Sequence, residues 1–396
     1  MRPQIVIGLS EHGLDSVPTA GGLRADGRVD VDERYGMDVT TDTVRIWGPS
    51  PEAVHRGMTS LRQLATAGMA DSSSRIAVMR ANDGPRFAWR GLSLDISRTF
   101  HGPETLRRVI DMCSLFKLNV LHLHLTDNEG WRFEVPNWPL LTEIGGLGAT
   151  GDRRGGWLTR EDVAALVAYA AERFVTIVPE VDIPGHAGAV FAAYPELGPN
   201  SPTAISFGGM EVPIGTLDPD CDVTWRFVED VVDAVVAQFP QSGYVHIGGD
   251  ETFGMPDATH AAFVQRAIEI VKSRGRKAVG WQEVARAAVG EEELVQHWMD
   301  FDAMGSNPKL EDLKALVPEE FLSLLMDNIV KSGADVPASW RGGHDSSCRR
   351  RVVSTLTGRT PRSPPIPVRA KRAGASDSRC THRRPSRTAS TGTRST

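Results

Sequence analysis

Residues 244–252 read YVHIGGDET, and the rest of the sequence is organised around this stretch. It begins as a short apolar run, passes through two glycines and ends in adjacent carboxylates, the pattern of a buried strand that delivers acids at its C-terminal end. Side chains alternate between the two faces of a strand, so Asp250 and Glu251 can address one ligand only where the backbone departs from a regular strand. Gly248 and Gly249 permit that departure, because glycine tolerates bulges and close backbone approach. The alternative is a solvated acidic loop, and other parts of the chain decide between the two.

Length and composition indicate a soluble globular protein. The chain has 396 residues, 40% of them hydrophobic, enough to bury the core of one large domain or two. No stretch approaches the roughly 18 consecutive apolar residues of a membrane span, and the N-terminus lacks an apolar run long enough for a secretory signal. The four cysteines show neither close pairing nor metal-ligand spacing, so we expect free thiols and a cytoplasmic protein. A leader on a longer precursor would instead imply secretion.

From about residue 85 the sequence alternates strand-like and helix-like segments. Strands are expected at 91–97, 119–125, 174–180, from 244, 277–281 and 294–298, and helices at 103–117, 159–173, 223–239 and 258–274. Repeated βα units predict a parallel sheet with helical cover, and their number favours a (β/α)8 TIM-type barrel. The preceding segment combines strand-like pieces such as 43–47 with a helix at 51–67. We therefore predict a small α+β accessory domain at 1–84 and a catalytic barrel at 85–338.

Polar and aromatic residues recur where the predicted strands end, at the face on which barrel enzymes build their active sites. Seven residues share this placement: Arg98, Asp127, His186, Asp250, Glu251, Trp281 and Trp298. Asp127 and His186 can form a carboxylate–imidazole pair that tunes a nearby acid, or His186 can be a structural residue of its Pro-Gly turn. The two tryptophans can wall a sugar subsite or belong to the core. Arg98 can hold hydroxyl groups or form a structural salt bridge.

A second histidine motif allows a metal interpretation. His122 and His124 lie two residues apart and so share one face of a strand, and a zinc site would add His186 or His246. The pair lies within an apolar strand rather than at its end, however, and no further His-rich strand end accompanies it. The sequence therefore favours buried, hydrogen-bonded histidines and no metal site.

Four segments in order resemble glycoside hydrolase family 20, the β-N-acetylhexosaminidases. They are RGLSLDISR at 90–98, HLHLTDNEGWR at 122–132, VPEVDIPGH at 178–186 and HIGGDE at 246–251. The resemblance runs from about residue 43 to 335. The segment that precedes the predicted barrel is similar to the small α+β domain that often precedes the barrel in this family. The resemblance implies retaining hydrolysis of terminal β-linked N-acetylglucosamine or N-acetylgalactosamine, in which the 2-acetamido oxygen of the substrate replaces an enzyme nucleophile.

The resemblance also implies a role for each site residue. By its position in the motif, Glu251 would be the general acid and base, and Asp250 would orient the acetamido group. Asp127 and His186 would support Glu251, Arg98 would hold sugar hydroxyls, and Trp281 and Trp298 would enclose the acetamide and the ring. The expected partner is an oligosaccharide or glycoconjugate that contains N-acetylhexosamine. No cofactor is needed, neither a membrane nor a nucleic acid is expected, and the oligomeric state is left open.

The chain departs from the family after about residue 338. From Arg341 to Thr396 it holds 14 Arg plus Lys against 2 Asp plus Glu, a net of +12, and the total of −6 leaves −18 on residues 1–340. Only six barrel strands are apparent, and no residue matches the Tyr, Asp and Trp that family members supply after strands seven and eight. Residues 339–396 are thus a disordered basic extension, a divergent end that still folds, or an out-of-frame product, which the composition favours. We expect a barrel incomplete at its C-terminal strands, with weakened or absent catalysis; a degenerate sugar-binding protein or fragment is the alternative.

Overall fold

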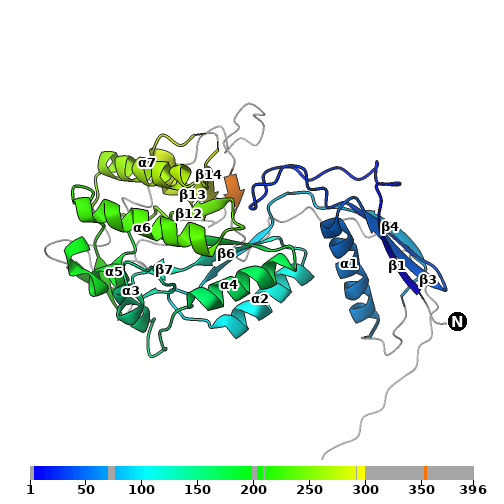
Figure 1. The fold of residues 1–396 in the computed structure, drawn as a ribbon, viewed down its shortest axis with the longest axis horizontal. Coiled ribbons are helices and arrows are strands. Elements are labelled where there is room, and N and C mark those ends of the chain that lie inside the picture. The colour runs from blue at the N-terminus through cyan, green and yellow to red at the C-terminus, as the bar shows by residue number, and fades with distance from the viewer. Residues whose placement is uncertain are drawn as a thin grey trace, which may run out of the picture. The chain divides into compact units, whose positions relative to one another are not determined.

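The computed structural model describes residues 4–69, 76–198, 203–207, 210–290, 292–298 and 352–354. The largest described sheet is parallel and has the strand order β15-β14-β13-β12-β9-β6-β5 (Figure 1). Its strands are β5 (Gly91–Asp95), β6 (Val120–His124), β9 (Thr176–Glu180), β12 (Tyr244–His246), β13 (Lys277–Trp281), β14 (Leu294–His297) and β15 (Val352–Ser354). Within the described ranges β5 and β15 end the sheet without pairing to each other, as in an incomplete TIM-type barrel. The six strands predicted from the sequence are confirmed.

The seventh strand lies where the sequence predicted none. β15 pairs in parallel with β14, with Val352 opposite Val295 and Ser354 opposite His297. It falls inside the segment 339–396 that was assigned to a tail, so the expectation of no further strand is wrong for these three residues. The two valines follow a run of arginines, and two apolar residues are too few to show the alternating hydrophobic pattern of a strand. The remainder of 339–396 lies outside the described residues, and the predicted divisions at 84 and 338 stay predictions.

Four long helices cover one face of the sheet and lie side by side (Figure 1). They are α2 (Pro103–Leu115), α4 (Arg160–Ala171), α6 (Asp222–Gln238) and α7 (Asp257–Ser273). All four were predicted, and local chemistry sets their ends. Thr159 and Asp162 form a capping box at the start of α4, each side chain accepting the other's backbone N–H. Pro103 opens α2, and Lys117, whose φ is 58°, turns the chain after it.

The inner face of the sheet is built from two layers of different chemistry. Toward the strand starts the side chains are apolar: Val120, Val178, Tyr244, Val279 and Leu294, with Ala25 of the preceding segment packed against them. Toward the strand ends they are buried and polar: His122, His124, Glu180, His246 and Gln296. Barrel interiors are ordinarily filled by branched apolar residues, so the polar layer indicates that this part of the interior does more than fill space.

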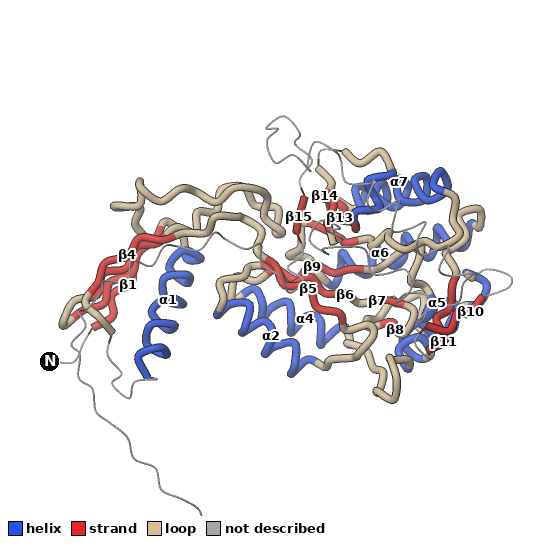
Figure 2. Tube along the Cα trace, turned by 180° about the vertical axis from the view of Figure 1, so that it is seen from behind, coloured by secondary structure: helices blue, strands red, loops and turns tan. Residues whose placement is uncertain are grey.

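A separate four-stranded sheet with order β1-β3-β2-β4 precedes the parallel sheet in the chain. It consists of β1 (Gln4–Leu9), β2 (Tyr35–Val39), β3 (Thr43–Gly48) and β4 (Met79–Asp83), and α1 (Pro51–Met69) packs against it (Figure 2). The apolar face of α1 meets Met37, Val39 and Ile46, as its helical spacing predicted. The sequence predicted β3 and α1, whereas it gave no bounds for β1, β2 and β4.

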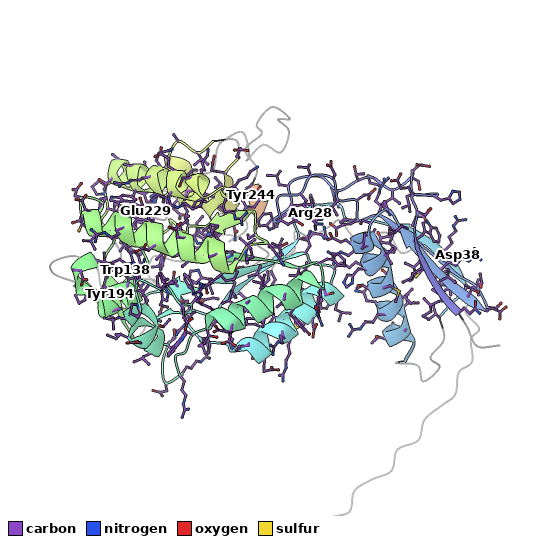
Figure 3. All side chains as sticks on the ribbon, viewed as in Figure 1. Arg28, Asp38, Trp138, Tyr194, Glu229 and Tyr244 are labelled. Atoms are coloured by element: carbon purple, nitrogen blue, oxygen red, sulfur yellow. The ribbon has the colours of Figure 1, made fainter. Side chains whose placement is uncertain are left out.

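Shorter elements complete the described chain. They are β7 (Thr126–Asp127), β8 (Gly130–Trp131), α3 (Leu140–Glu143), α5 (Gly188–Ala193), β10 (Thr203–Phe207), β11 (Met210–Ile214) and the 3-10 helices η1 (Gly145–Leu147), η2 (Pro195–Leu197) and η3 (Gln282–Arg286). Trp138 and Tyr194, labelled in Figure 3, anchor two of the connecting segments because their rings meet edge to face at 4.8 Å. None of the described helices combines the length and apolar character that a bilayer crossing requires. Cys113 and Cys221 are free thiols, as expected; Cys348 and Cys380 lie outside the described residues.

A buried ion network joins the start of the chain to the start of β5. Glu33 is 3% exposed and lies 2.9 Å from Arg24, 2.9 Å from Arg56 and 2.6 Å from Arg90. Glu52 supplies the second carboxylate, 2.8 Å from Arg56 and 2.9 Å from Arg24. Burial alone would raise the pKa of Glu33, but the guanidinium groups of Arg90 and Arg56 hold that pKa below its usual value. Each charge in the network depends on the others for compensation.

Replacing Glu33 with Gln is expected to lower the free energy of unfolding by about 3–5 kcal/mol, because removing one partner of a buried ion pair leaves the remaining charges uncompensated. Urea unfolding near neutral pH measures the difference. Glu104→Gln is the matched control, since Glu104 pairs with Arg107 but is 80% exposed, and it should unfold like the unchanged protein. Equal midpoints for both variants would contradict the stabilising role of the network.

Candidate active site

The segment after β12 leaves the strand through a run of left-handed backbone conformations. The φ angles are 68° at Gly248, 93° at Gly249 and 44° at Glu251. A left-handed conformation is strained for any residue with a Cβ, and such residues concentrate at functional sites. The predicted departure from a regular strand is therefore confirmed, and Glu251 itself carries part of the strain.

Asp182, after the end of β9, fixes this turn. Its Oδ1 accepts a 3.0 Å hydrogen bond from the backbone N–H of Gly249, while the Gly249 carbonyl accepts one from His260 Nε2 at 2.8 Å. A Cβ on Gly248 would lie 1.8 Å from Asp182 Oδ1, so no other residue fits there without a shift. Gly248 is thus required by both its φ angle and the close approach of a carboxylate.

Asp127 is the centre of the polar contacts at the strand ends. It is 1% exposed, and its two oxygens lie 2.7 Å from Arg98 Nη2, 2.8 Å from His124 Nε2 and 3.1 Å from His186 Nδ1. Burial alone would raise the pKa of Asp127, but the cationic groups around it hold that pKa well below the usual range. The carboxylate–imidazole pair predicted for Asp127 and His186 is present. Arg98 also pairs with Asp95, so the salt-bridge interpretation of this arginine is confirmed, and its side chain remains 41% exposed.

His186 connects Asp127 to the adjacent carboxylates. Its Nδ1 contacts Asp127, and its Nε2 lies 3.6 Å from Glu251, 3.8 Å from Asp250 and 4.0 Å from Asp182. Although burial lowers it, the carboxylates of Asp127 and Asp250 raise the pKa of His186 to about 10. Burial and the neighbouring carboxylate of Asp182 raise the pKa of Asp250 well above the usual range. His186 is therefore a cation at neutral pH, surrounded by acids.

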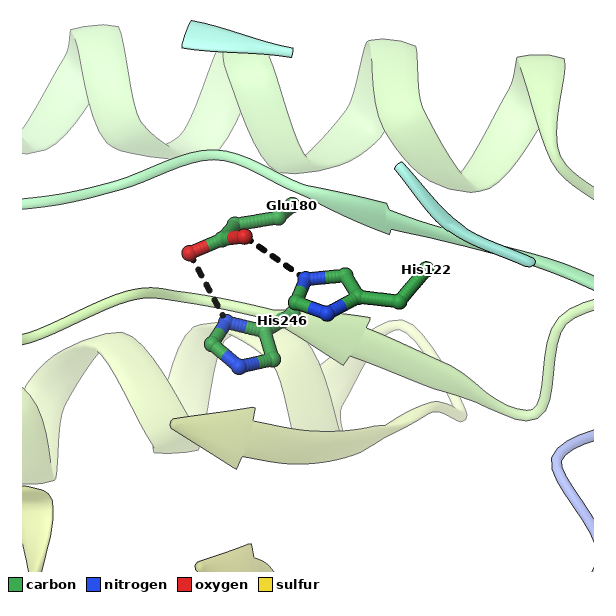
Figure 4. Close-up of side chains that lie close together, drawn as sticks. All are labelled: His122, Glu180 and His246. Atoms are coloured by element: carbon green, nitrogen blue, oxygen red, sulfur yellow. Dashed lines mark ion pairs between the residues drawn. The ribbon is translucent and has the colours of Figure 1, made fainter. Parts of the chain in front are cut away.

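Glu180, the last residue of β9, lies among these residues, and the sequence assigned it no role. It is fully buried, and Oε2 lies 2.6 Å from His122 Nε2, while Oε1 lies 3.3 Å from His246 Nδ1 (Figure 4). Oε2 also lies 2.8 Å from His124 Nδ1. Oε1 also accepts a 2.7 Å hydrogen bond from Trp281 Nε1. Glu180 could have been found from one signal, a glutamate at the end of an otherwise apolar strand whose neighbour carries two histidines on one face.

Three groups of described side chains bring potential metal ligands together: His122, Glu180 and His246; His124, Asp127 and Asp182; Asp182, His186 and Asp250. An imidazole nitrogen and a carboxylate oxygen bound tetrahedrally to one zinc ion lie roughly 3.3 Å apart, given metal–ligand bonds of about 2.0 Å. The 2.6 Å between His122 and Glu180 fits direct contact instead. His246 Nδ1 also accepts the backbone N–H of Gly248 at 3.1 Å, and burial lowers the pKa of His246 to about 3. The short His122–Glu180 contact therefore favours the buried-histidine interpretation for this pair.

The predicted tryptophans occupy neighbouring strand ends. Trp281 ends β13, with its ring edge-on to His246 at 4.8 Å. Trp298 follows β14, donates its backbone N–H to Gln282 Oε1 at 3.3 Å and its indole N–H to Glu283 Oε2 at 3.2 Å. The structure thus joins five of the seven predicted residues through direct contacts, and it ties Trp281 to Glu180 and Trp298 to Glu283.

Comparison with known proteins gives the same family that the motifs resemble. Residues 87–256 match the model described as the glycosyl hydrolase family 20 catalytic domain. A β-N-acetylhexosaminidase of Cellulomonas fimi is 37% identical over 267 residues, 67% of this chain and 53% of the relative. A β-hexosaminidase of Porphyromonas gingivalis is 32% identical over 330 residues, 76% of this chain and 41% of the relative. The chain spans about half the length of these curated relatives.

Solved structures agree with the sequence relatives. The GH20 β-N-acetylhexosaminidase of Streptomyces coelicolor A3(2) superposes with a TM-score of 0.68 at 32% identity, covering 88% of this chain and 62% of that one. The N-acetyl-β-hexosaminidase of Streptomyces plicatus, solved with Thio-NAglucal, gives 0.63 at 34% identity over 76% of this chain and 60% of that one. The described part of this chain therefore superposes on part of each of these family 20 structures.

Gly248→Ala is expected to destabilise the protein more than Gly254→Ala. Both glycines have positive φ angles, 68° and 83°, so both variants carry the left-handed strain of roughly 1–2 kcal/mol. Only Gly248 lacks room for a Cβ, which adds about 1–3 kcal/mol of overpacking, whereas nothing lies within 4 Å of a Cβ on Gly254. Urea unfolding of the two variants measures the difference, and equal losses would show that Asp182 gives way without cost.

The charge of His186 should make stability depend on pH. Because its pKa rises from 6.5 to about 10 on folding, its contribution is complete below pH 6.5 and declines as the pH rises toward 10. Free energies of unfolding of the unchanged protein and of His186→Asn should therefore converge across this window. A difference that stays constant from pH 6.5 to 10 would mean that His186 is neutral in the folded protein.

Proposed function

Residues 87–256 belong to glycosyl hydrolase family 20, and on that premise we propose that the protein hydrolyses terminal β-linked N-acetylglucosamine or N-acetylgalactosamine from oligosaccharides or glycoconjugates. The observation that carries the proposal is the continuous set of contacts from Asp127 through His186 to Asp250 and Glu251. It lies within the family-matching segment, at the strand ends where barrel enzymes build their sites. The solved Streptomyces plicatus relative with product GlcNAc supports the sugar class.

Glu251 is the general acid and base of the proposed reaction. Its side chain is 29% exposed against 14% for Asp250, so it is the member of the pair that a leaving group can reach. In the first step its proton passes to the glycosidic oxygen as the bond to the anomeric carbon breaks. In the second step its carboxylate takes a proton from water, which attacks the same carbon. His186, held through Nδ1 by Asp127, orients the Glu251 carboxyl from 3.6 Å.

Asp250 orients the substrate's own nucleophile. The 2-acetamido oxygen attacks the anomeric carbon and forms a cyclic oxazolinium-like intermediate, so no enzyme carboxylate becomes covalently attached. A positive charge that develops beside Asp250 stabilises its carboxylate form, which burial and Asp182 disfavour in the free site. Interaction that strengthens as the charge forms lowers the barrier rather than tightening ground-state binding. The substrate supplies the nucleophile, so the proposed mechanism needs no cofactor.

Arg98, Trp281 and Trp298 hold the sugar. Arg98 is fixed by Asp95 and Asp127 yet keeps 41% of its side chain exposed, which leaves donors for ring hydroxyls. The tryptophans end or follow neighbouring strands β13 and β14, and their indoles offer flat apolar surfaces to the acetamide and to the C–H face of the ring. In this proposal Arg98 recognises the hydroxyl groups, and the two tryptophans enclose the acetamide and the ring.

Hydrolysis of aryl N-acetyl-β-glucosaminides tests the proposal. Glu251→Gln should lose roughly 10²–10⁴-fold in kcat with a poorly departing phenol, because departure then requires a proton, and lose less with a nitrophenol. Glu269→Gln on the exposed face of α7, where Glu269 accepts a hydrogen bond from Gln265, is the control and should retain full turnover.

Two outcomes would count against this assignment. A loss that is equal for both leaving groups would remove the acid role from Glu251. An unchanged protein that binds N-acetylglucosamine without turnover would instead support the catalytically impaired sugar-binding protein expected from the C-terminal departure.

A further inference from the structure

Glu180 lies at the centre of the polar layer, out of reach of any substrate. It is fully buried, and the register of the sheet places it opposite His124 of β6 on one side and His246 of β12 on the other. His122 shares the face of His124, so the carboxylate meets histidines from both neighbouring strands. These contacts hold the pKa of Glu180 well below its usual value, against the effect of burial. The group is thus an anion at the middle of the sheet.

One oxygen of Glu180, Oε1, accepts a hydrogen bond from Trp281. The indole Nε1, the ring's single polar atom, donates to Oε1 over 2.7 Å, and the ring packs against His246 at 4.8 Å and His122 at 5.6 Å. Trp281 is half-buried, and an indole that loses its acceptor must find another partner, which favours a different ring orientation. We therefore expect the orientation of the Trp281 ring to depend on the Glu180 carboxylate.

The other oxygen, Oε2, is linked to Asp127 through the ring of His124. His124 Nδ1 lies 2.8 Å from Glu180 Oε2, and His124 Nε2 lies 2.8 Å from Asp127 Oδ2. An imidazole that faces a carboxylate with each nitrogen is doubly protonated, and the two anions raise the pKa of His124 well above the usual value, although burial lowers it. Asp127 in turn contacts His186 and Arg98.

We propose that Glu180 is a positioning residue for the reaction, one buried carboxylate that sets both Trp281 and, through His124, the Asp127–His186 pair. The proposal rests on the hydrolysis proposed above. Glu180 acts on the two sides of the site at once: on the wall that encloses the acetamide and on the pair that orients Glu251. No contact with the substrate is required.

Glu180→Gln tests the proposal because the amide cannot satisfy both sides. With its oxygen toward Trp281, its NH₂ group faces the N–H groups of His122 and His124; in the opposite orientation it faces the indole N–H. We expect kcat for an aryl N-acetyl-β-glucosaminide to fall about 10–100-fold, as for other residues that orient ligating or reacting groups, and KM to change less. Such a split indicates misaligned reacting groups rather than lost ground-state binding.

Nuclear magnetic resonance supplies a readout independent of turnover. In full-length protein labelled with ¹⁵N-tryptophan and ¹⁵N-histidine, the Trp281 indole signal, assigned with Trp281→Phe, should move in Glu180→Gln. The His124 ring, assigned with His124→Gln, should change from doubly protonated to neutral near pH 7. Glu293→Gln is the matched control, since Glu293 is also buried but pairs with Lys272 next to the start of β14, and it should leave kcat and both signals unchanged.

The outcomes separate this inference from the proposed function. Moved signals with lowered kcat support it, whereas unmoved signals, or an unchanged kcat in a folded variant, overturn it. If the unchanged protein shows no hydrolysis while the signals still move, the proposed function fails and the positioning of Trp281 and His124 by Glu180 stands.

Discussion

The structure depends on the compensation of one buried charge. Glu180 is completely withdrawn from water, and an isolated carboxylate in that position would be too costly to keep ionised. Contacts of 2.6 Å to His122 and 2.8 Å to His124, with the Trp281 indole on the second oxygen, supply the compensation. Because these partners come from β6 and β13, on either side of β9, the charge is satisfied only when the strands meet in the observed register. The strand register that lets these partners compensate Glu180 also places Trp281 and His124 beside the candidate site.

Charge pairing recurs at the opposite end of the strands with a different result. The network around Glu33 uses arginines, whose guanidinium groups stay protonated, and joins the start of the chain to the residue before β5. The network above the sheet uses histidines, whose protonation follows their neighbours, so that His124 and His186 are cations while His246 is neutral. The first arrangement joins elements of the chain, and the second fixes residues of the candidate site.

Local backbone strain occurs in the site, as it does at Lys117 and Phe174 elsewhere in the described chain. Glu251 and His186 both adopt positive φ angles, 44° and 51°, which cost free energy for residues with a Cβ. The surrounding hydrogen bonds, such as that from the Gly249 N–H to Asp182, hold the turn in this form. Both residues follow strands, Glu251 after β12 and His186 after β9, and the held turns fix where the acids point.

The sequence by itself determined the βα order, six of the seven parallel strands and the chemistry at their ends, because periodicity and caps are local properties. Asp127, His186, Asp250 and Glu251 could be named from it, since carboxylates and imidazole at strand ends indicate chemistry in any barrel. Only the tertiary structure decided that His122, His124 and His246 meet around Glu180, and that Val352–Ser354 joins the sheet. Those facts depend on strand register and on contacts between residues far apart in the chain, which no local pattern encodes.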